Sequence, residues 1–139
     1  MPIEENKKIV QRYQKIYNSN DLDALGEVVA DDLLTPKIMP GMASGLEGGK
    51  QVHKKTLIGM PDWQTAIDEL IAEGDKAVAR VTMTGTHTGD FYGIPATGKR
   101  VEFSGIYIVR IENGKIVEHW GEEDSLSLLT QLGVMPKSS

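Results

Sequence analysis

The 139-residue chain contains no cysteine, and this absence excludes one class of chemistry at once. Without thiols, neither disulfide bonds nor cysteine nucleophiles are available, although the redox compartment stays undecided. No apolar run approaches the length of a membrane-spanning helix. The N-terminal residues MPIEENKKIV also lack the apolar core of a signal peptide. The sequence therefore predicts a cytoplasmic protein with no membrane partner.

Basic clusters are missing as well. The chain has 15 Lys and Arg residues against 20 Asp and Glu residues, a net charge of −5, and no basic run with interleaved aromatic residues. Because phosphate backbones bind to positively charged surfaces, we expect no nucleic-acid partner. The 3 histidines are scattered without the spacing of metal ligands. The sequence therefore predicts no metal site, and it indicates no cofactor.

What is present is the pattern of one α+β domain over residues 1–139. A chain of this length can bury roughly two-thirds of its unfolded surface. Apolar residues at helical spacing predict helices over residues 4–17 and 50–59, and Asp21 is a candidate N-cap for a short helix between them. Residues 31–49 predict a short strand followed by a loop. The final helix is predicted over residues 125–132.

Strands are predicted in the second half, over residues 63–72, 76–88, 101–111 and 115–121. In the two middle strands, apolar side chains at odd positions alternate with more polar ones, so the odd set is expected to face the core. Helices followed by a run of antiparallel strands are typical of a curved sheet with helices on one face.

The register of the last two strands depends on the Asn-Gly turn at residues 113–114. A two-residue turn would place Tyr107 opposite Trp120. A three-residue loop with a bulge would place Tyr107 opposite His119. We favour the three-residue loop because it brings Val117 onto the inner face with other apolar side chains. Tyr107 and His119 then form a polar cross-strand pair on an apolar face, which is where a site is expected.

The opposite face of the same strands carries an apolar stripe, predicted to consist of Ile106, Ile108, Ile116 and Trp120. A soluble monomer seldom exposes such a stripe. We therefore expect a homodimer through the outer face of the sheet.

Three segments, GTHTGDFYGIPATGKRV, IYIVRIENGKIVEHW and DSLSLLTQLG, resemble the SnoaL-like polyketide cyclase family of the NTF2-like superfamily. The resemblance spans nearly the whole chain. It implies an α+β cone, in which a curved antiparallel sheet and N-terminal helices enclose an apolar pocket, and often a dimer. The best-understood members close the last ring of an aromatic polyketide by intramolecular aldol condensation, using an aspartate and a histidine. Those two positions hold Gly121 and Tyr107 here, so neither catalytic residue is carried over.

The candidate catalytic residues are His119, Tyr107 and Asp124. Imidazole titrates near neutral pH, so His119 could remove a carbon-bound proton next to a carbonyl group. Tyr107 could donate a hydrogen bond to the developing enolate oxygen. Alternatively, these two residues form a hydrogen-bonded pair that fills the pocket floor. Asp124 most simply caps the last helix, with a second possible role at the pocket mouth.

The candidate substrate-binding residues share an expected position on the inner face or its rim. His87 is expected at the rim and His53 on a helix face, whereas Glu122 and Glu123 are interpreted as a solvated surface. Trp63 and Phe91 fit either the core or the pocket lining. The substrate-binding set is Trp63, Met83, His87, Phe91, Phe103 and Gly121.

Three functions remain open at this point. The first is an aldol cyclase or isomerase that acts on a hydrophobic, polyketide-like small molecule. The second is a cofactor-free hydroxylase acting on a similar substrate. The third is a non-catalytic module that binds a small molecule or serves dimerisation.

Overall fold

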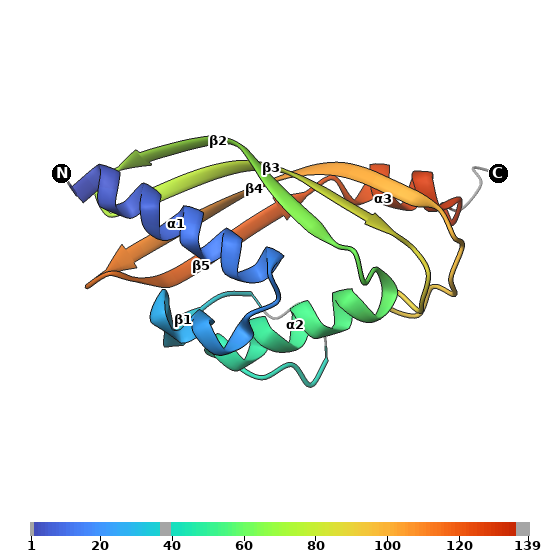
Figure 1. The fold of residues 1–139 in the computed structure, drawn as a ribbon, viewed down its shortest axis with the longest axis horizontal. Helices are drawn as coiled ribbons and strands as arrows, with labels where there is room; N and C mark the ends of the chain where they lie inside the picture. The colour runs from blue at the N-terminus through green and yellow to red at the C-terminus, as the bar shows by residue number, and fades with distance from the viewer. Residues whose placement is uncertain (1, 37–39, 136–139) are drawn as a thin grey trace.

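The structure is a computed structural model that describes residues 2–36 and 40–135. The predicted helices and strands are present, although the second long helix begins at Gly45 rather than at residue 50. Along the chain (Figure 1), the elements are α1 (Pro2–Asn18), the 3₁₀ helix η1 (Leu22–Glu27), β1 (Val29–Leu34), α2 (Gly45–Gly59), β2 (Gln64–Glu73), β3 (Lys76–Thr86), β4 (Arg100–Glu112), β5 (Lys115–Glu123) and α3 (Ser125–Leu132).

The strands form one curved sheet in the order β1-β5-β4-β3-β2, and its two edge strands do not pair to close it (Figure 1). Strands β2 to β5 are antiparallel, as predicted. Strand β1 instead runs parallel to β5, with Val29 beside Ile116 and Leu34 beside Glu118. The expectation of a purely antiparallel sheet is therefore wrong at this edge. A parallel neighbour needs a long crossover connection, and the chain between β1 and β5 supplies it.

Buried and more exposed side chains alternate along β3 and β4, and this alternation identifies the buried face of the sheet. In β3 the odd positions from Ala77 to Gly85 are buried, while Lys76 and Arg80 are exposed. Strand β4 repeats this pattern over its whole length. We call the buried side the concave face. Its apolar side chains pack with residues of α1, η1 and α3 such as Val10, Leu25 and Leu132 to form the hydrophobic core.

Helix α1 lies along β2 and is fixed there by one side-chain amide. Asn18 Nδ2 donates to the carbonyl of Thr65 at 2.8 Å, and the Thr65 N–H donates to Asn18 Oδ1 at 2.9 Å. Helix α2 lies beside β1, and α3 lies at the end of the molecule away from the start of α1 (Figure 1). None of the described helices is long and apolar enough to cross a membrane.

Candidate active site

The turn between β4 and β5 has two residues, not the predicted three. Asn113 and Gly114 both have positive φ, 50° and 76°, and Glu112 pairs with Lys115. Positive φ at both central residues defines the turn type whose twist matches that of a hairpin, and Asn-Gly is its preferred sequence. The three-residue loop is therefore wrong, and so is the direct pairing of Tyr107 with His119.

A bulge at Val117 then restores the inward position of His119. Ile111 pairs with Ile116, and the next pair is Arg110 with Glu118, which leaves Val117 as the extra residue. A bulge inserts one residue, so every later side chain changes face relative to an unbulged strand. As a result, Tyr107 lies opposite Gly121 rather than opposite Trp120.

The same bulge corrects two side-chain predictions. Ile116 does not belong to the outer stripe, because it is only 1% exposed and lies in the core. Val117 is only partly buried and does not pair with Val109, whose partner is His119. The outer stripe therefore consists of Ile106, Ile108 and Trp120.

Tyr107 and His119 are diagonal neighbours on the concave face and stack on each other. Their ring centroids are 5.1 Å apart with an interplanar angle of 29°. Tyr13 of α1 completes the group, with centroids 5.9 Å from Tyr107 and 6.0 Å from His119. We call these three residues the Tyr–His cluster. It brings α1, β4 and β5 together at one place, beside Gly121.

The hydroxyl of Tyr107 already has a partner. It donates to Oε1 of Gln14 at 3.2 Å, and both residues are buried. The expected hydrogen-bonded pair of Tyr107 and His119 is therefore a stacked pair instead. To donate to an enolate oxygen, Tyr107 would have to give up its bond to Gln14.

Burial keeps the Tyr–His cluster uncharged near neutral pH. Loss of hydration raises the pKa of Tyr107 well above its usual value and does the same for Tyr13, where the neighbouring Tyr17 adds to the effect. His119 keeps part of its surface exposed, but its imidazole is enclosed by aromatic rings, and desolvation lowers its pKa to about 4. His119 is therefore a neutral imidazole at pH 7 and a weaker base than its sequence alone suggests.

This pKa shift makes a prediction for stability. The pKa of His119 is lowered from 6.5 to about 4 in the folded chain. At pH values between these two pKa values, the unfolded state therefore binds more protons than the folded state does. The free energy of unfolding should therefore fall as the pH drops from 6.5 towards 4. The variant His119→Phe keeps an aromatic ring and removes the titration. In urea unfolding at pH 7 and about pH 5, it should lose less stability than the wild type does; equal losses would contradict the assignment.

Four of the predicted substrate-binding residues lie close together, with Met83 of β3 paired with Phe103 of β4 and Trp63 in contact with Phe91 and Phe103. Met83, Phe91 and Phe103 are buried, whereas Trp63 is partly exposed. The Trp63 ring lies edge-on to Phe103 at 5.7 Å and stacks on Phe91 at 6.3 Å. Met83, Phe91 and Phe103 therefore belong to the hydrophobic core, whereas Trp63 is accessible to a ligand.

His87 is not at the rim, where we expected it. It is 0% exposed, with Nδ1 2.9 Å from Thr97 Oγ1 and Nε2 3.1 Å from the carbonyl oxygen of Ile94. The Thr97 N–H also donates to Nδ1 at 3.3 Å, so Nδ1 accepts and Nε2–H donates to Ile94. His87 thus fixes the loop that follows β3, and both ring nitrogens are occupied.

Asp124 and His53 are held in structural roles. Oδ1 of Asp124 accepts from the Ser127 N–H at 3.0 Å and caps α3, which ends at Gly133 with a φ of 76°. This is the simpler of the two roles expected for Asp124. His53 is buried on α2, and its Nε2 lies 2.8 Å from Asn20 Oδ1.

Glu123, which the sequence analysis interpreted as part of a solvated surface, is exposed as expected, but the strand pairing also assigns it to a face of the sheet. It pairs directly with Gly105, whose neighbours along β4, Phe103 and Tyr107, point to the concave face. Glu123 therefore shares this face with His119 and Gly121. The sequence signal for this position is the spacing of two residues from 119 to 121 and from 121 to 123, because residues at this spacing in a strand share one face.

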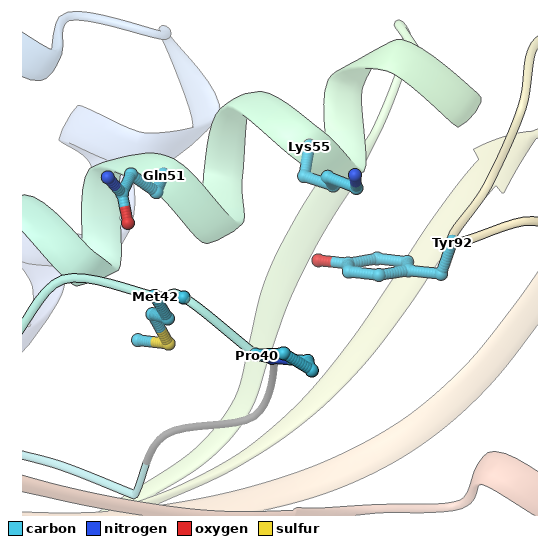
Figure 2. Close-up of a pocket in the computed structure, with 6 residues that line it drawn as sticks. Pro40, Met42, Gln51, Lys55 and Tyr92 are labelled. Atoms are coloured by element: carbon cyan, nitrogen blue, oxygen red, sulfur yellow. The ribbon is translucent and has the colours of Figure 1, made fainter.

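A separate hollow of about 470 Å³ lies between α2 and the segment before it (Figure 2). Gln51 and Lys55 project from α2, and Tyr92 reaches across from the loop after β3. The Gln51 amide oxygen accepts from Ala43 N–H, and the Tyr92 hydroxyl donates to the Val52 carbonyl. No member of the Tyr–His cluster lines this hollow.

Within residues 2–36 and 40–135, no group of three or more His, Asp or Glu side chains is arranged to hold a metal ion. The arrangement on the concave face instead suits a hydrophobic ligand. It offers aromatic rings for contact and a few polar side chains, Tyr107, His119 and Glu123, that could orient or protonate a carbonyl compound.

Comparison with known proteins places the chain in a family. Residues 7–132 match the family model described as SnoaL-like polyketide cyclase. The aklanonic acid methyl ester cyclase DauD from Streptomyces sp. (strain C5) is 27% identical over 140 residues, covering 90% of this chain and 80% of that protein.

Two solved structures share the fold. TsrD from Streptomyces laurentii has a TM-score of 0.86 and 32% identity, covering 95% of this chain and 97% of the other. AclR from Streptomyces galilaeus, described as a candidate hydroxylase, has a TM-score of 0.84 and 28% identity, covering 99% of this chain and 90% of the other.

Proposed function

This chain belongs to the SnoaL-like polyketide cyclase family, and we propose that it binds a hydrophobic polyketide ester on its concave face and closes a ring in it by acid–base catalysis. The observation that carries the proposal is the convergence of Tyr107, His119 and Gly121 at one place on an otherwise apolar face. The similarity to DauD supports a polyketide methyl ester as the substrate class.

The reaction proposed is an intramolecular aldol addition. A base removes a proton from the carbon next to one carbonyl group, and the resulting enolate carbon attacks a second carbonyl carbon of the same molecule. A carbon–carbon bond forms, the attacked carbonyl becomes an alkoxide, and the alkoxide takes up a proton. Atoms and charge balance without an oxidant or a metal ion.

His119 contributes to this reaction as a neutral imidazole. With a pKa lowered to about 4, it is uncharged at neutral pH and can donate one N–H to the enolate oxygen. Trp63 supplies an aromatic surface that a planar polyketide can contact. The Tyr107–Gln14 bond holds the cluster in place, which makes Tyr107 a positioning residue.

The proposal is tested by incubating the purified chain with aklanonic acid methyl ester and separating the products by liquid chromatography with mass detection. Ring closure gives a new species of unchanged mass. Hydroxylation, the second candidate, which is favoured by the similarity to AclR, adds the mass of one oxygen atom. Binding without conversion, measured by quenching of Trp63 fluorescence, would support the non-catalytic function and overturn the proposed one.

We also propose that the chain forms a homodimer through the outer stripe. Ile108 and Trp120 are directly paired, and together with Ile106 they are 41%, 45% and 48% exposed, respectively. Three large apolar side chains side by side on an open sheet face favour a partner surface of the same kind.

Trp120→Glu is therefore expected to shift the elution of the chain in size-exclusion chromatography from dimer to monomer, because an apolar interface cannot accommodate an unpaired charge. Ile58→Glu is the matched control, since Ile58 is 62% exposed on α2 and lies outside the stripe. Elution of Trp120→Glu together with the wild type would exclude this interface.

A further inference from the structure

Gly121 lies at the centre of a small polar frame on the concave face. Tyr107 is directly opposite it in β4, and His119 and Glu123 flank it at a spacing of two residues in β5. Each flanking residue is therefore a diagonal neighbour of Tyr107, and the main-chain positions of such neighbours are typically roughly 7–8 Å apart. Because Gly121 has no side chain, the frame is open at its centre.

The side chain of Glu123 begins on the apolar inner surface. A Cβ atom built on Gly105 would lie 3.3 Å from the Glu123 Cβ and 3.0 Å from the Met83 Cε. Met83 is a buried core residue, at 7% exposure. Gly105, which lies opposite Glu123, thus leaves room for the base of the Glu123 side chain, and Gly121 two residues before it has no side chain either.

The carboxylate is also accessible. Strand β1 pairs with β5 only as far as Glu118, so the edge of β5 near Glu123 has no neighbouring strand on that side. Glu123 itself remains exposed. A ligand that lies over Gly121 could therefore contact the Glu123 carboxylate and the His119 ring from the same side.

No ion pair among the described residues involves Glu123. Glu118, on the outer face of the same strand, differs in this respect because its carboxylate is bound by Arg110. The titratable side chains of the Tyr–His cluster, which lies beside Gly121 and shares the concave face with Glu123, are Tyr107 of β4, His119 of β5 and Tyr13 of α1. None of them carries a charge at neutral pH that would compensate a carboxylate.

We propose that Glu123 is the general base of this site, an inference that rests on the proposed cyclase function. Its carboxylate removes the proton from the carbon next to the substrate carbonyl as the enolate forms. The enolate carbon attacks the second carbonyl carbon, and the protonated Glu123 returns its proton to the new alkoxide. The carboxylate is then regenerated without any added reactant.

The basicity of the two flanking residues supports this assignment. Although Glu123 is exposed as a whole residue, the surrounding protein removes part of the hydration of its carboxylate and raises its pKa above the ordinary value of 4.5, whereas desolvation lowers the pKa of His119 to about 4. Glu123 is therefore the stronger base of the two at this site. A catalytic base is most effective when its pKa approaches the working pH, so the shift in Glu123 is in the useful direction.

The test uses the full chain with aklanonic acid methyl ester as the probe. Glu123→Gln keeps the size and polarity of the side chain and removes its basicity, so kcat should fall about 100-fold or more, with the dissociation constant nearly unchanged. Glu122→Gln is the matched control, because Glu122 pairs with Ile106 on the outer face. It should retain wild-type kcat.

The outcomes separate the two proposals. Turnover by the wild type with less than a tenfold loss in Glu123→Gln would overturn the role of Glu123 and leave the cyclase function intact. A wild type that converts none of the ester would overturn the cyclase function and this inference together. A further readout is the pH dependence of kcat, whose acidic limb should disappear in Glu123→Gln; an unchanged limb would also count against Glu123.

Discussion

Gly121→Asp, introduced into the Glu123→Gln variant, is expected to raise the rate of ring closure by about a hundred- to ten-thousand-fold. The change returns a carboxylate to the centre of the polar frame, opposite Tyr107 and beside His119. Because this face is apolar, desolvation should raise the pKa of the new carboxyl group and make it a better base near neutral pH.

The backbone at Gly121 accepts this side chain. Gly121 is not among the glycines with positive φ, so an L-residue meets no conformational strain there. A Cβ atom would lie 3.4 Å from His119 Cε1 and 3.7 Å from Tyr107 Cβ, both ordinary van der Waals contacts. The variant should therefore fold with little loss of stability.

Gly121→Asn in the same Glu123→Gln background is the control, since it adds nearly the same volume without a base. Rates of ring closure are compared by following the product of aklanonic acid methyl ester. Equal rates for the Asp and Asn variants, with both proteins folded and binding the ester, would show that the reacting carbon does not lie over Gly121.

Gly89→Ala is expected to lower the free energy of unfolding by about 3 kcal/mol. The added Cβ would lie 2.2 Å from the carbonyl oxygen of Ile58, a contact with backbone that no rotamer change can relieve. Relief requires the loop after β3 to move away from the end of α2. The N–H groups of Thr88 and Gly89, each 3.1 Å from the Gly59 carbonyl oxygen, would then lose their acceptor.

Urea unfolding measures this loss, and Gly26→Ala is the control. The nearest atom to a Cβ at Gly26 is Leu46 Cδ2 at 3.6 Å, which is an ordinary contact, so the control should change stability by less than about 0.5 kcal/mol. If both variants unfold at the wild-type urea concentration, α2 and the loop do not pack as closely as described.

The sequence by itself determined the elements and the family. Alternation in residues 76–88 and 101–111 identified the two central strands and their buried faces, because the direction of a side chain in a strand depends only on its position along that strand. Asp124 and Gly133 likewise bound α3 as predicted, since capping depends on neighbouring residues alone. The three segments that resemble the SnoaL-like family identified the correct family, because a sequence motif can be recognised without knowing the fold.

The composition of the site was decided by the tertiary structure. The bulge at Val117 arises where β5 pairs with its hairpin partner β4 on one side and with β1 on the other, and the pairing with β1 is not contained in the local sequence of the hairpin. It sets Ile116 in the core and keeps His119 on the concave face. Counting along the sequence from the turn cannot locate an inserted residue, because the alternation of side chains continues from the turn only where no bulge interrupts it.

Long-range contacts also decided what each polar side chain can do. The Tyr107 hydroxyl donates a hydrogen bond to Gln14, which lies 93 residues away in the sequence. Thr97 and the Ile94 carbonyl group occupy the two ring nitrogens of His87. Packing against Tyr13 and Tyr107 changes the basicity of His119. The residue type determines which reactions and hydrogen bonds a side chain can take part in. Burial and hydrogen-bond partners determine its protonation state and which of its polar atoms are free, and only the folded chain supplies them.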